Sequence, residues 1–375
     1  MTAQTLGAWS VETRRRDDGL DGLGTEWDGL LARCTPATAF QSYPWLESWW
    51  HTYGTPGRLR LVLVRHGGRL VAAAPLMLRR RGGGQVLTPL GGPFSDFTDV
   101  LVDDDEPAAA DVLASAIVAL PGWEALHFAE ARPGSLAGTL LRDAWPGRRF
   151  EAPASLCLEL PAMSMEDLAR DLPQHSRKTV RHRLNQLRKA APDIREVTAA
   201  DADGALAGLL RLHAAQWAGR GGNRDHLEPR FAAHLARAVP AMIRSGRAAL
   251  LEYRFDGMLT ASSLVLIGHD HVGGYLYGAQ PQLRDRVDVT TMLLADTLPM
   301  AYRLGLPTMT MLRGAEDHKL RWRPREARNR QILLARPGSV RGAAYANAVL
   351  AYRQAVLTAK RRAPWLRTVR DWVRR

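Results

Sequence analysis

Two segments of the chain that lie 189 positions apart carry the same β-hairpin pattern. Residues 61–78 read LVLVRHGGRLVAAAPLML, and residues 250–267 read LLEYRFDGMLTASSLVLI. In each segment two apolar runs flank a two-residue turn, Gly67-Gly68 or Asp256-Gly257, and these residue types accept the positive φ that tight hairpin turns require. The repeat predicts a duplicated α/β unit. Two unrelated hairpins are the alternative, because the apolar-turn-apolar pattern is common.

Length and composition narrow the class of protein. A chain of 375 residues predicts two or three domains with enough apolar content for a buried core. Cys34 and Cys157 are the only cysteines, so we expect neither a disulfide framework nor a cysteine-based zinc site, and no metal site is predicted. No apolar run reaches membrane-span length and residues 1–20 lack the apolar region of a signal peptide, so we expect a soluble, cytoplasmic protein, with a monomer favoured.

Charge is distributed unevenly along the chain. Residues 1–160 contain 15 basic and 19 acidic residues, whereas residues 161–375 contain 36 basic and 19 acidic ones. This excess predicts a polyanionic partner such as RNA or a phosphate-rich cofactor, and a solvated basic surface is the alternative. The main clusters are residues 177–189, 321–330 and 360–375. The candidate nucleic-acid-binding residues are Arg177, Lys178, Arg181, Arg183, Arg188, Arg321 and Arg323.

The order of predicted elements is similar in the two halves: helix, hairpin, strand, helix, strand. Apolar periodicity predicts helices at residues 27–34, 111–120, 165–190 with a break at Pro173, 206–218, 231–245 with a kink at Pro240, 289–304, 345–360 and 365–373. Further strands are predicted at residues 125–129, 155–160, 271–277 and 308–312. We therefore expect mixed α/β sheets in two tandem units, residues 1–160 and 161–335, followed by a basic helical extension, residues 336–375.

Four segments, in this order, resemble a known family: FQSYPWLESWWHTYG, LTPLGGPFSDFTDVLV, LLRLHAAQWAGRGG and MLRGAEDHKLRWRP. Together they resemble tandem GNAT-fold acyltransferases of the CelD/BcsL type, which are distantly similar to Fem-type aminoacyl-tRNA-dependent transferases. The resemblance covers roughly residues 25–335. It implies acyl transfer to an amine, with the acyl donor placed where two parallel strands splay apart.

The identity of the donor is open at this point. Acetyl-CoA-dependent members of the fold hold a pyrophosphate on backbone N–H groups at a glycine-rich helix N-terminus. The corresponding residues 282–290 contain no glycine, and Asp285 and Asp288 would repel a phosphate. This departure favours aminoacyl-tRNA slightly over acyl-CoA as the co-substrate, with no tightly bound cofactor. A binding protein that retains the fold without the chemistry is a third hypothesis.

The resemblance also suggests which residues act. Lys319 matches a lysine that faces the reacting carbonyl in Fem-like relatives, where an ammonium group would stabilise the oxyanion. Asp96 or Asp99 could orient or deprotonate the attacking amine, and Glu316 or Asp317 is the competing base. A surface ion pair is the alternative role for Lys319, and turn or cap chemistry beside a Gly-Gly-Pro segment is the alternative for the aspartates.

The candidate substrate-binding residues are His213, Trp217, Tyr275, Tyr277 and Arg313. His213 and Trp217 lie four positions apart on one predicted helical face, where core packing is the alternative for the tryptophan. Tyr275 and Tyr277 alternate along a predicted strand and should point to one face. The asymmetry between the two halves predicts a site in a cleft between them, with the donor on the second half.

Overall fold

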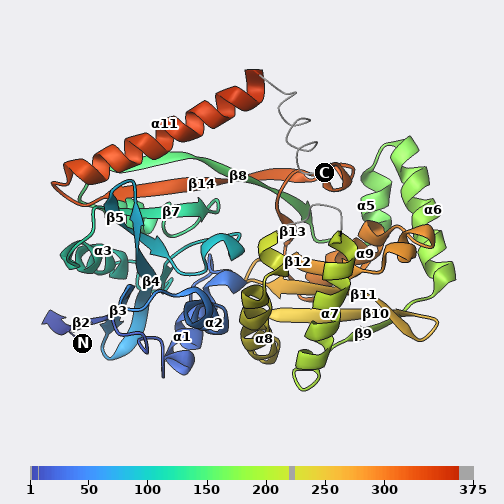
Figure 1. Ribbon diagram of the computed structural model, residues 1–375, viewed down its shortest axis with the longest axis horizontal. Coiled ribbons are helices and arrows are strands. Elements are labelled where there is room, and N and C mark those ends of the chain that lie inside the picture. The colour runs from blue at the N-terminus through green and yellow to red at the C-terminus, as the bar shows by residue number, and fades with distance from the viewer. Residues whose placement is uncertain (1, 7, 219–223, 363–375) are drawn as a thin grey trace. The chain divides into compact units, whose positions relative to one another are not determined.

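The computed structural model describes residues 2–6, 8–218 and 224–362, and the chain forms two compact units (Figure 1). Unit 1 comprises Met1–Ser155 and Arg328–Arg375, and unit 2 comprises Leu156–Ala327. The predicted helix at residues 365–373 and the glycines at the end of LLRLHAAQWAGRGG lie outside the described residues.

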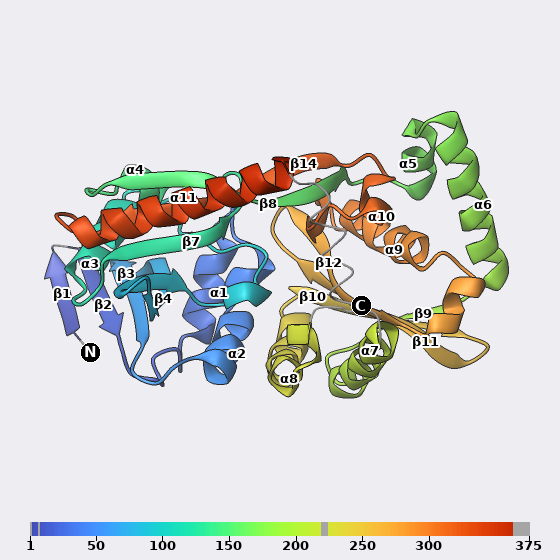
Figure 2. The ribbon, with the colours of Figure 1, turned by 45° about the horizontal axis from the view of Figure 1, so that its top comes forward.

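Unit 2 is built on a mixed sheet with the strand order β9-β10-β11-β12-β13-β8. Its strands are β9 (Asp193–Glu196), β10 (Ala248–Phe255), β11 (Met258–Ile267), β12 (His271–Ala279), β13 (Thr308–Arg313) and the second part of β8 (Arg149–Pro161). Its helices are α5 (Met165–Asp171), α6 (Gln174–Ala190), α7 (Ala202–Trp217), α8 (Pro229–Arg244), α9 (Val289–Arg303) and α10 (Asp317–Leu320). Helices α7 and α8 cover one face of the sheet, and α9 covers the other (Figure 2).

Unit 1 has a related sheet with the strand order β1-β2-β3-β4-β5-β7-β14, and β6 pairs with β4. Its strands are β1 (Thr2–Leu6), β2 (Trp9–Arg14), β3 (Leu59–His66), β4 (Arg69–Arg81), β5 (Gly84–Pro89), β6 (Leu101–Val102), β7 (Ala125–Ala131) and most of β14 (Arg325–Ala335). Its helices are α1 (Gly24–Ala32), α2 (Tyr43–Tyr53), α3 (Ala109–Ala119), α4 (Leu140–Asp143) and α11 (Val340–Arg362). Short 3-10 helices occur at Ala39–Gln41, Gly92–Phe94, Arg224–Leu227 and Pro281–Asp285.

The two hairpins that define the sequence repeat have the same detailed geometry. Arg65 pairs with Leu70 in unit 1, and Arg254 pairs with Leu259 at the corresponding place in unit 2. In both hairpins the register shifts immediately before the arginine, so each contains an irregularity at the same distance from its turn. The four turn residues have φ between 52° and 81°, as a two-residue turn of this kind requires. A shared irregularity and a shared turn support duplication over chance resemblance.

The duplication extends beyond the hairpins. In unit 2 the parallel pair is β12 with β13, joined through α9, and in unit 1 it is β5 with β7, joined through α3. All other strand pairs within each unit are antiparallel. Each unit therefore repeats the order strand, two helices, three antiparallel strands, helix and parallel strand.

The last strand of each unit comes from the other half of the sequence. Cys157 to Pro161 of β8 pair with β13 in unit 2, although β8 follows unit 1 in the chain. Arg330 to Ala335 of β14 pair with β7 in unit 1, although β14 follows unit 2. The predicted boundaries after residues 160 and 335 therefore differ from the observed ones. Helix α11, predicted as a separate extension, belongs to unit 1, because Tyr345 contacts His127 of β7.

Within the described residues, the predicted helices and hairpins are confirmed within a few residues at most ends. The break at Pro173 separates α5 from α6, Pro240 lies inside α8, and Gly305 follows α9 with a φ of 68°. The sequence patterns did not predict β1, β2, β9 or β14. Of these, β1 and β9 are edge strands, and β14 pairs with β7 from a distant part of the chain.

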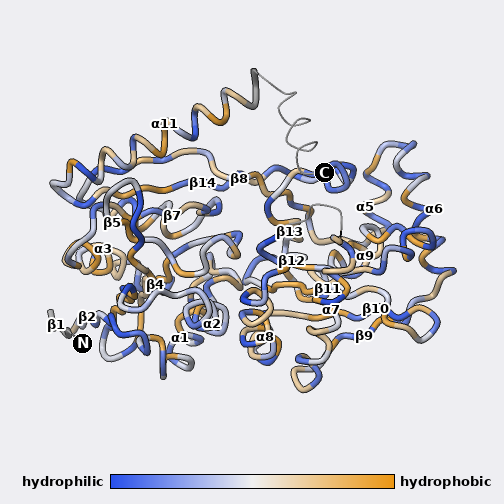
Figure 3. The backbone as a smooth tube through the Cα atoms, viewed as in Figure 1, coloured by the Kyte–Doolittle hydropathy of each residue, from blue (hydrophilic) through white to orange (hydrophobic). Residues whose placement is uncertain are grey.

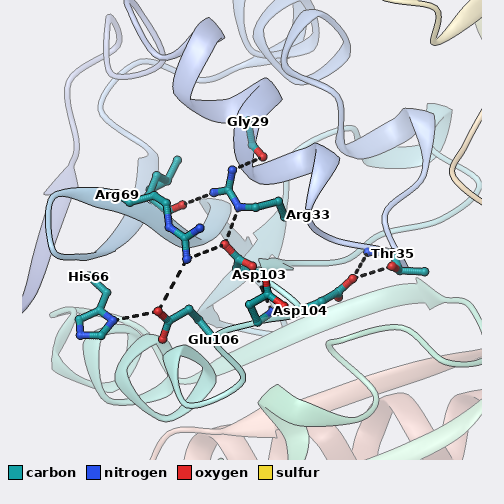
Figure 4. Close-up of polar contacts among 10 residues, drawn as sticks. Gly29, Arg33, Thr35, His66, Arg69, Asp103, Asp104 and Glu106 are labelled. Carbon is teal, nitrogen blue, oxygen red and sulfur yellow. Dashed lines mark hydrogen bonds and ion pairs between the residues drawn. The ribbon is translucent and has the colours of Figure 1, made fainter.

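A buried ion pair fastens α1 to the sheet of unit 1 (Figure 4). Asp103 has no solvent exposure, and its carboxylate lies 2.6 Å from Nε of Arg33 and 3.5 Å from the guanidinium of Arg69. Arg33 also donates to the carbonyl oxygens of Gly29 and Leu70. Part of the acidic segment after residue 100 thus serves internal packing.

None of the helices in the described part of the chain combines the length and the apolar content that crossing a membrane would require.

Candidate active site

The parallel strands of unit 2 separate after a short paired segment. Only His271 to Gly273 of β12 pair with Thr308 to Thr310 of β13. Beyond that point β13 loses its regular register with β8, and Leu312 adopts a φ of 56°. On the other side of the gap, the register of β12 shifts at Tyr275. Two strands that are irregular on both sides of a gap leave room for a ligand at their carboxyl ends.

A cavity of about 120 Å³ occupies this splayed region. Its apolar walls are Leu276, Leu293, Leu294, Met309, Met311 and Trp322, and Gly274 lies beside them. Its polar groups are Ser263, Tyr277, Thr290, Thr297, His318 and Lys319. The lining comes from β11, β12, β13, α9, α10 and the residues just after α10. A small apolar cavity with a cation at its edge suits an acyl group whose carbonyl faces the polar side.

Lys319 is positioned by the turn that follows β13. Its ammonium group donates to the carbonyl oxygen of Arg313 at 3.0 Å and forms an ion pair with Glu316 at 2.9 Å. An ammonium group has three N–H donors, so one remains for a ligand. The ion pair that we considered as the alternative role for Lys319 is therefore present, and the same side chain also lines the cavity.

The conformation of Gly314 explains why a glycine follows Arg313 in the segment MLRGAEDHKLRWRP. Gly314 has a φ of 113°, and a Cβ at this position would lie 2.4 Å from Oε1 of Glu316. A glycine is needed because the carboxylate folds back over the backbone to reach Lys319. Burial acts to raise the pKa of Glu316, but the neighbouring Lys319 ammonium outweighs it and holds the pKa below its usual value. Glu316 is thus a carboxylate at neutral pH and a poor proton acceptor.

Asp96 and Asp99 lie in unit 1, where the Asp99 side chain binds backbone N–H groups. The Asp99 carboxylate accepts hydrogen bonds from the backbone N–H groups of Val100, Leu136 and Ala137 at 2.7–2.9 Å. Burial raises the pKa of Asp99 to about 7, although these three bonds act to lower it. The Asp96 carbonyl oxygen accepts a hydrogen bond from Asn329. For Asp99 this arrangement favours the structural alternative over catalysis.

The aromatic motifs of unit 1 pack on one another. Trp45 donates from its indole to Ser95, and Gln41 donates to the carbonyl oxygen of Phe97, so FQSYPWLESWW holds the loop that contains GGPFSDF. Both motifs that carried the resemblance in the first half therefore contribute to the core.

His213 and Trp217 secure α7 to β12. The His213 Nδ1 atom lies 2.7 Å from the carbonyl oxygen of Tyr277 and donates to it, and the Trp217 ring contacts the His213 ring edge-on at 6.3 Å. Burial lowers the pKa of His213, although the bond to Tyr277 acts to raise it. Of the five predicted substrate-binding residues, only Tyr277 lines the cavity, and Arg313 contributes its carbonyl oxygen to Lys319. Tyr275 lies at the register shift of β12, which interrupts the alternation we expected.

Asp288 fills the N-terminus of α9. Its carboxylate accepts from the backbone N–H of Thr291 at 2.8 Å and from the hydroxyl of Thr290 at 2.9 Å. Arg321 donates to both carboxylate oxygens, and Arg183 lies 3.4 Å away. Burial acts to raise the pKa of Asp288, but the bonds from Arg321 and Thr291 hold it well below its usual range. The helix N-terminus is thus neutralised by a carboxylate from the chain itself.

The predicted nucleic-acid-binding residues divide into two sets. Arg177 donates to the carbonyl oxygens of Arg170 and Leu172, and Arg183 and Arg321 pair with Asp288, so these three have internal partners. The exposed set is Lys178, Arg181, Arg188 and Arg323. Arg181 and Arg188 also line a groove between α5 and α6 together with Arg170 and Asn185.

His318 is a site residue that the sequence did not reveal. Its side chain lines the cavity beside Lys319 and Trp322. Burial lowers the pKa of His318, and the positive charges of Lys319 and Arg321 lower it further, against the effects of Glu316 and Asp288. The alternation of Met309 and Met311 on β13 was the one sequence signal that could have located this cavity wall.

A mixed sheet with a hairpin and one parallel strand pair, present in both units, defines a tandem GNAT-fold protein. Residues 174–320, the segment from α6 to α10, match the family model described as "Acetyltransferase (GNAT) domain". No curated protein matches the chain.

Solved structures share this fold at low sequence identity. The crystal structure of FemX is 12% identical, with a TM-score of 0.59 over 82% of this chain and 95% of that one. The C-terminal domain of a putative lysylphosphatidylglycerol synthetase from Agrobacterium fabrum is 12% identical, with a TM-score of 0.53 over 87% and 97% of the two chains. L-PGS from Bacillus licheniformis is 12% identical, with a TM-score of 0.52 over 87% and 96%. The expected likeness to tandem GNAT and Fem-type proteins is confirmed at the level of fold.

Proposed function

We propose that this chain forms an amide bond by transferring an acyl group to an amine, and that its acyl donor is an aminoacyl-tRNA. The observation that carries the choice of donor is the occupied N-terminus of α9. In CoA-dependent members of the fold, a pyrophosphate uses the N–H groups at this position. Here the Asp288 carboxylate already accepts from Thr291 and is held by Arg321. A pyrophosphate would have to displace or approach a fixed negative charge.

Helix α6 supplies the positive surface that a tRNA requires. Its 17 residues include no aspartate or glutamate, and Figure 3 shows it as largely hydrophilic. Lys178, Arg181 and Arg188 are exposed on it. Exposed basic side chains bind nucleic-acid phosphates by releasing condensed counterions. The fold shared with FemX, a Fem-type protein, supports the same choice.

The cavity in unit 2 would hold the acyl group, with its carbonyl near Lys319. The remaining N–H of Lys319 would donate to the carbonyl oxygen and stabilise the negative charge that develops as the amine attacks. The ion pair with Glu316 and the bond to Arg313 fix the ammonium group in advance. A donor of this kind would place the reaction in the cytoplasm, where charged tRNA is found.

The donor is tested by incubating the protein with a panel of amines and either charged tRNA or acyl-CoA, with and without ribonuclease. We expect amide formation from charged tRNA that ribonuclease abolishes. Activity that survives ribonuclease and requires acyl-CoA would overturn the proposed donor in favour of the CoA-dependent alternative. Lys319→Ala should lower turnover by about 100-fold or more, the usual effect of losing an oxyanion donor. Arg244→Ala is the matched control, because this exposed residue ends α8 and does not line the cavity.

The role of α6 is tested through salt dependence. The double change Arg181→Ala and Arg188→Ala should weaken tRNA binding and reduce the slope of log K against log salt by about 0.7–0.9 for each lost phosphate contact. Fluorescence anisotropy of labelled tRNA between low and moderate salt measures both quantities. An unchanged slope would show that the basic residues of α6 form a solvated surface and do not bind tRNA.

A further inference from the structure

The acyl-transfer reaction needs a group that accepts a proton from the attacking amine, and none of the carboxylates predicted for this role (Asp96, Asp99, Glu316 and Asp317) lines the cavity. Both oxygens of Asp99 accept backbone hydrogen bonds, and Glu316 is paired with Lys319. The carboxylate of Asp288 already accepts hydrogen bonds from Arg321, Thr290 and Thr291. Burial raises the pKa of the Tyr277 hydroxyl, so this cavity residue is protonated at neutral pH.

His318 lies where a proton acceptor is needed, and its ring can still form a hydrogen bond. It lines the same cavity as Lys319, and its side chain is also exposed to solvent. In the described part of the chain no hydrogen bond involves its ring, unlike His213, which is bonded to Tyr277. A ring nitrogen is therefore available to a ligand in the cavity.

We propose that His318 is the general base of this enzyme, and that it shuttles a proton from the acceptor amine to the leaving oxygen. This inference rests on the proposed acyl transfer. The amine enters as the free base, and its lone pair forms a C–N bond to the ester carbonyl carbon while the carbonyl oxygen gains negative charge beside Lys319. His318 takes one proton from the nitrogen. The C–O bond to the tRNA ribose then breaks, and the imidazolium returns this proton to the leaving alkoxide, giving amide and free hydroxyl.

The charges around His318 keep it ready to accept a proton at neutral pH. The groups that act on it are Lys319 and Arg321, which lower its pKa, and Glu316 and Asp288, which raise it; burial has the largest effect and lowers it. The ring is therefore neutral at pH 7 and charges only in more acidic solution. A neutral base beside a fixed ammonium group is the combination that amine acylation needs.

The test uses the full-length protein and whichever donor the wild type accepts. His318→Gln should lower kcat by about 100-fold or more with KM changed only a few-fold, and the acidic limb of the kcat profile, which reports groups in the enzyme–substrate complex, should disappear. Lys319→Ala should lower the rate but retain that limb. Added imidazole should partly restore His318→Ala. His51→Gln, an exposed histidine of unit 1, should leave the rate unchanged.

Two results would overturn the assignment. One is a His318→Gln protein that retains the wild-type rate and acidic limb. The other is an NMR titration in which the His318 ring is already protonated at pH 7. Failure of the tRNA donor is separate, because it would appear as wild-type activity with acyl-CoA alone, and the His318 variants would then be compared with that donor. The NMR titration needs no donor.

Discussion

The carboxylate at the N-terminus of α9 gives a stability prediction with a defined magnitude and pH window. Asp288→Asn keeps a side-chain oxygen that can cap the helix but removes the charge, whereas Asp288→Ala removes both. Arg321 donates to both oxygens of Asp288 at 2.6 and 3.3 Å, and Arg183 lies 3.4 Å away. Hydrogen bonds to charged groups contribute about 1.5–3 kcal/mol, and partial exposure reduces that value through solvent screening.

We therefore expect Asp288→Asn to lower the free energy of unfolding by about 1–2 kcal/mol at pH 7. Asp288→Ala should lower it by about 1 kcal/mol more, because the helix also loses its N-cap. The pKa of Asp288 is below its ordinary 3.8 in the folded state, so its charge stabilises the fold above about pH 4. That stabilisation is lost as the pH falls through the lower, folded-state pKa. The difference between wild type and Asp288→Asn should shrink accordingly.

Urea unfolding followed by circular dichroism at pH 7 and at about pH 3 measures these differences. Hydrogen exchange at the Thr291 amide provides a local readout, since this N–H donates to Asp288. Equal stability of wild type and Asp288→Asn at pH 7 would refute the reasoning, as would a difference that persists undiminished at low pH.

Two further predictions concern the packing of unit 1. Arg33→Ala should lower the free energy of unfolding by about 3–5 kcal/mol, because it leaves the buried Asp103 carboxylate without its nearest partner; a loss below 1 kcal/mol in urea unfolding would contradict this. Gly342→Ala should detach the start of α11, because a Cβ there would lie 2.0 Å from the carbonyl oxygen of Glu124, just before β7. Limited proteolysis should then cut the helix faster. Gly204→Ala in α7 is the control, since its Cβ meets nothing within 4 Å and should stabilise that helix by up to about 1 kcal/mol. Equal proteolysis of the Gly342→Ala protein and the wild type would show that α11 adapts to the added methyl group.

The sequence predicted the position of Lys319 in the candidate site but not that of its neighbour His318. The motif around Lys319 identified that residue as a candidate, and the structure places it on the cavity wall beside its ion-pair partner Glu316. The sequence could not show that His318 faces the same cavity, because a histidine beside a lysine in a one-turn helix has no periodic signature. Nor could it show that Asp99 is committed to backbone N–H groups near residue 136, because that contact spans 37 positions.

The local features of the chain were determined by the sequence itself. The two hairpins follow from turn residues that accept positive φ, and the helix boundaries at Pro173 and Gly305 follow from backbone restrictions that act over a few residues. The register shift shared by the hairpins confirmed what the repeat had predicted.

Only the tertiary structure decided which strands complete each sheet and which side chains meet in the cavity. Strand β8 pairs with β13 about 150 positions later, and β14 pairs with β7 about 200 positions earlier. Pairing of this kind depends on which sheet edge is open after the rest of the chain has folded, and a strand's own residues do not record it. The same long-range pairing positions β13 and the turn after it, and so brings His318 and Lys319 to the gap beside β12.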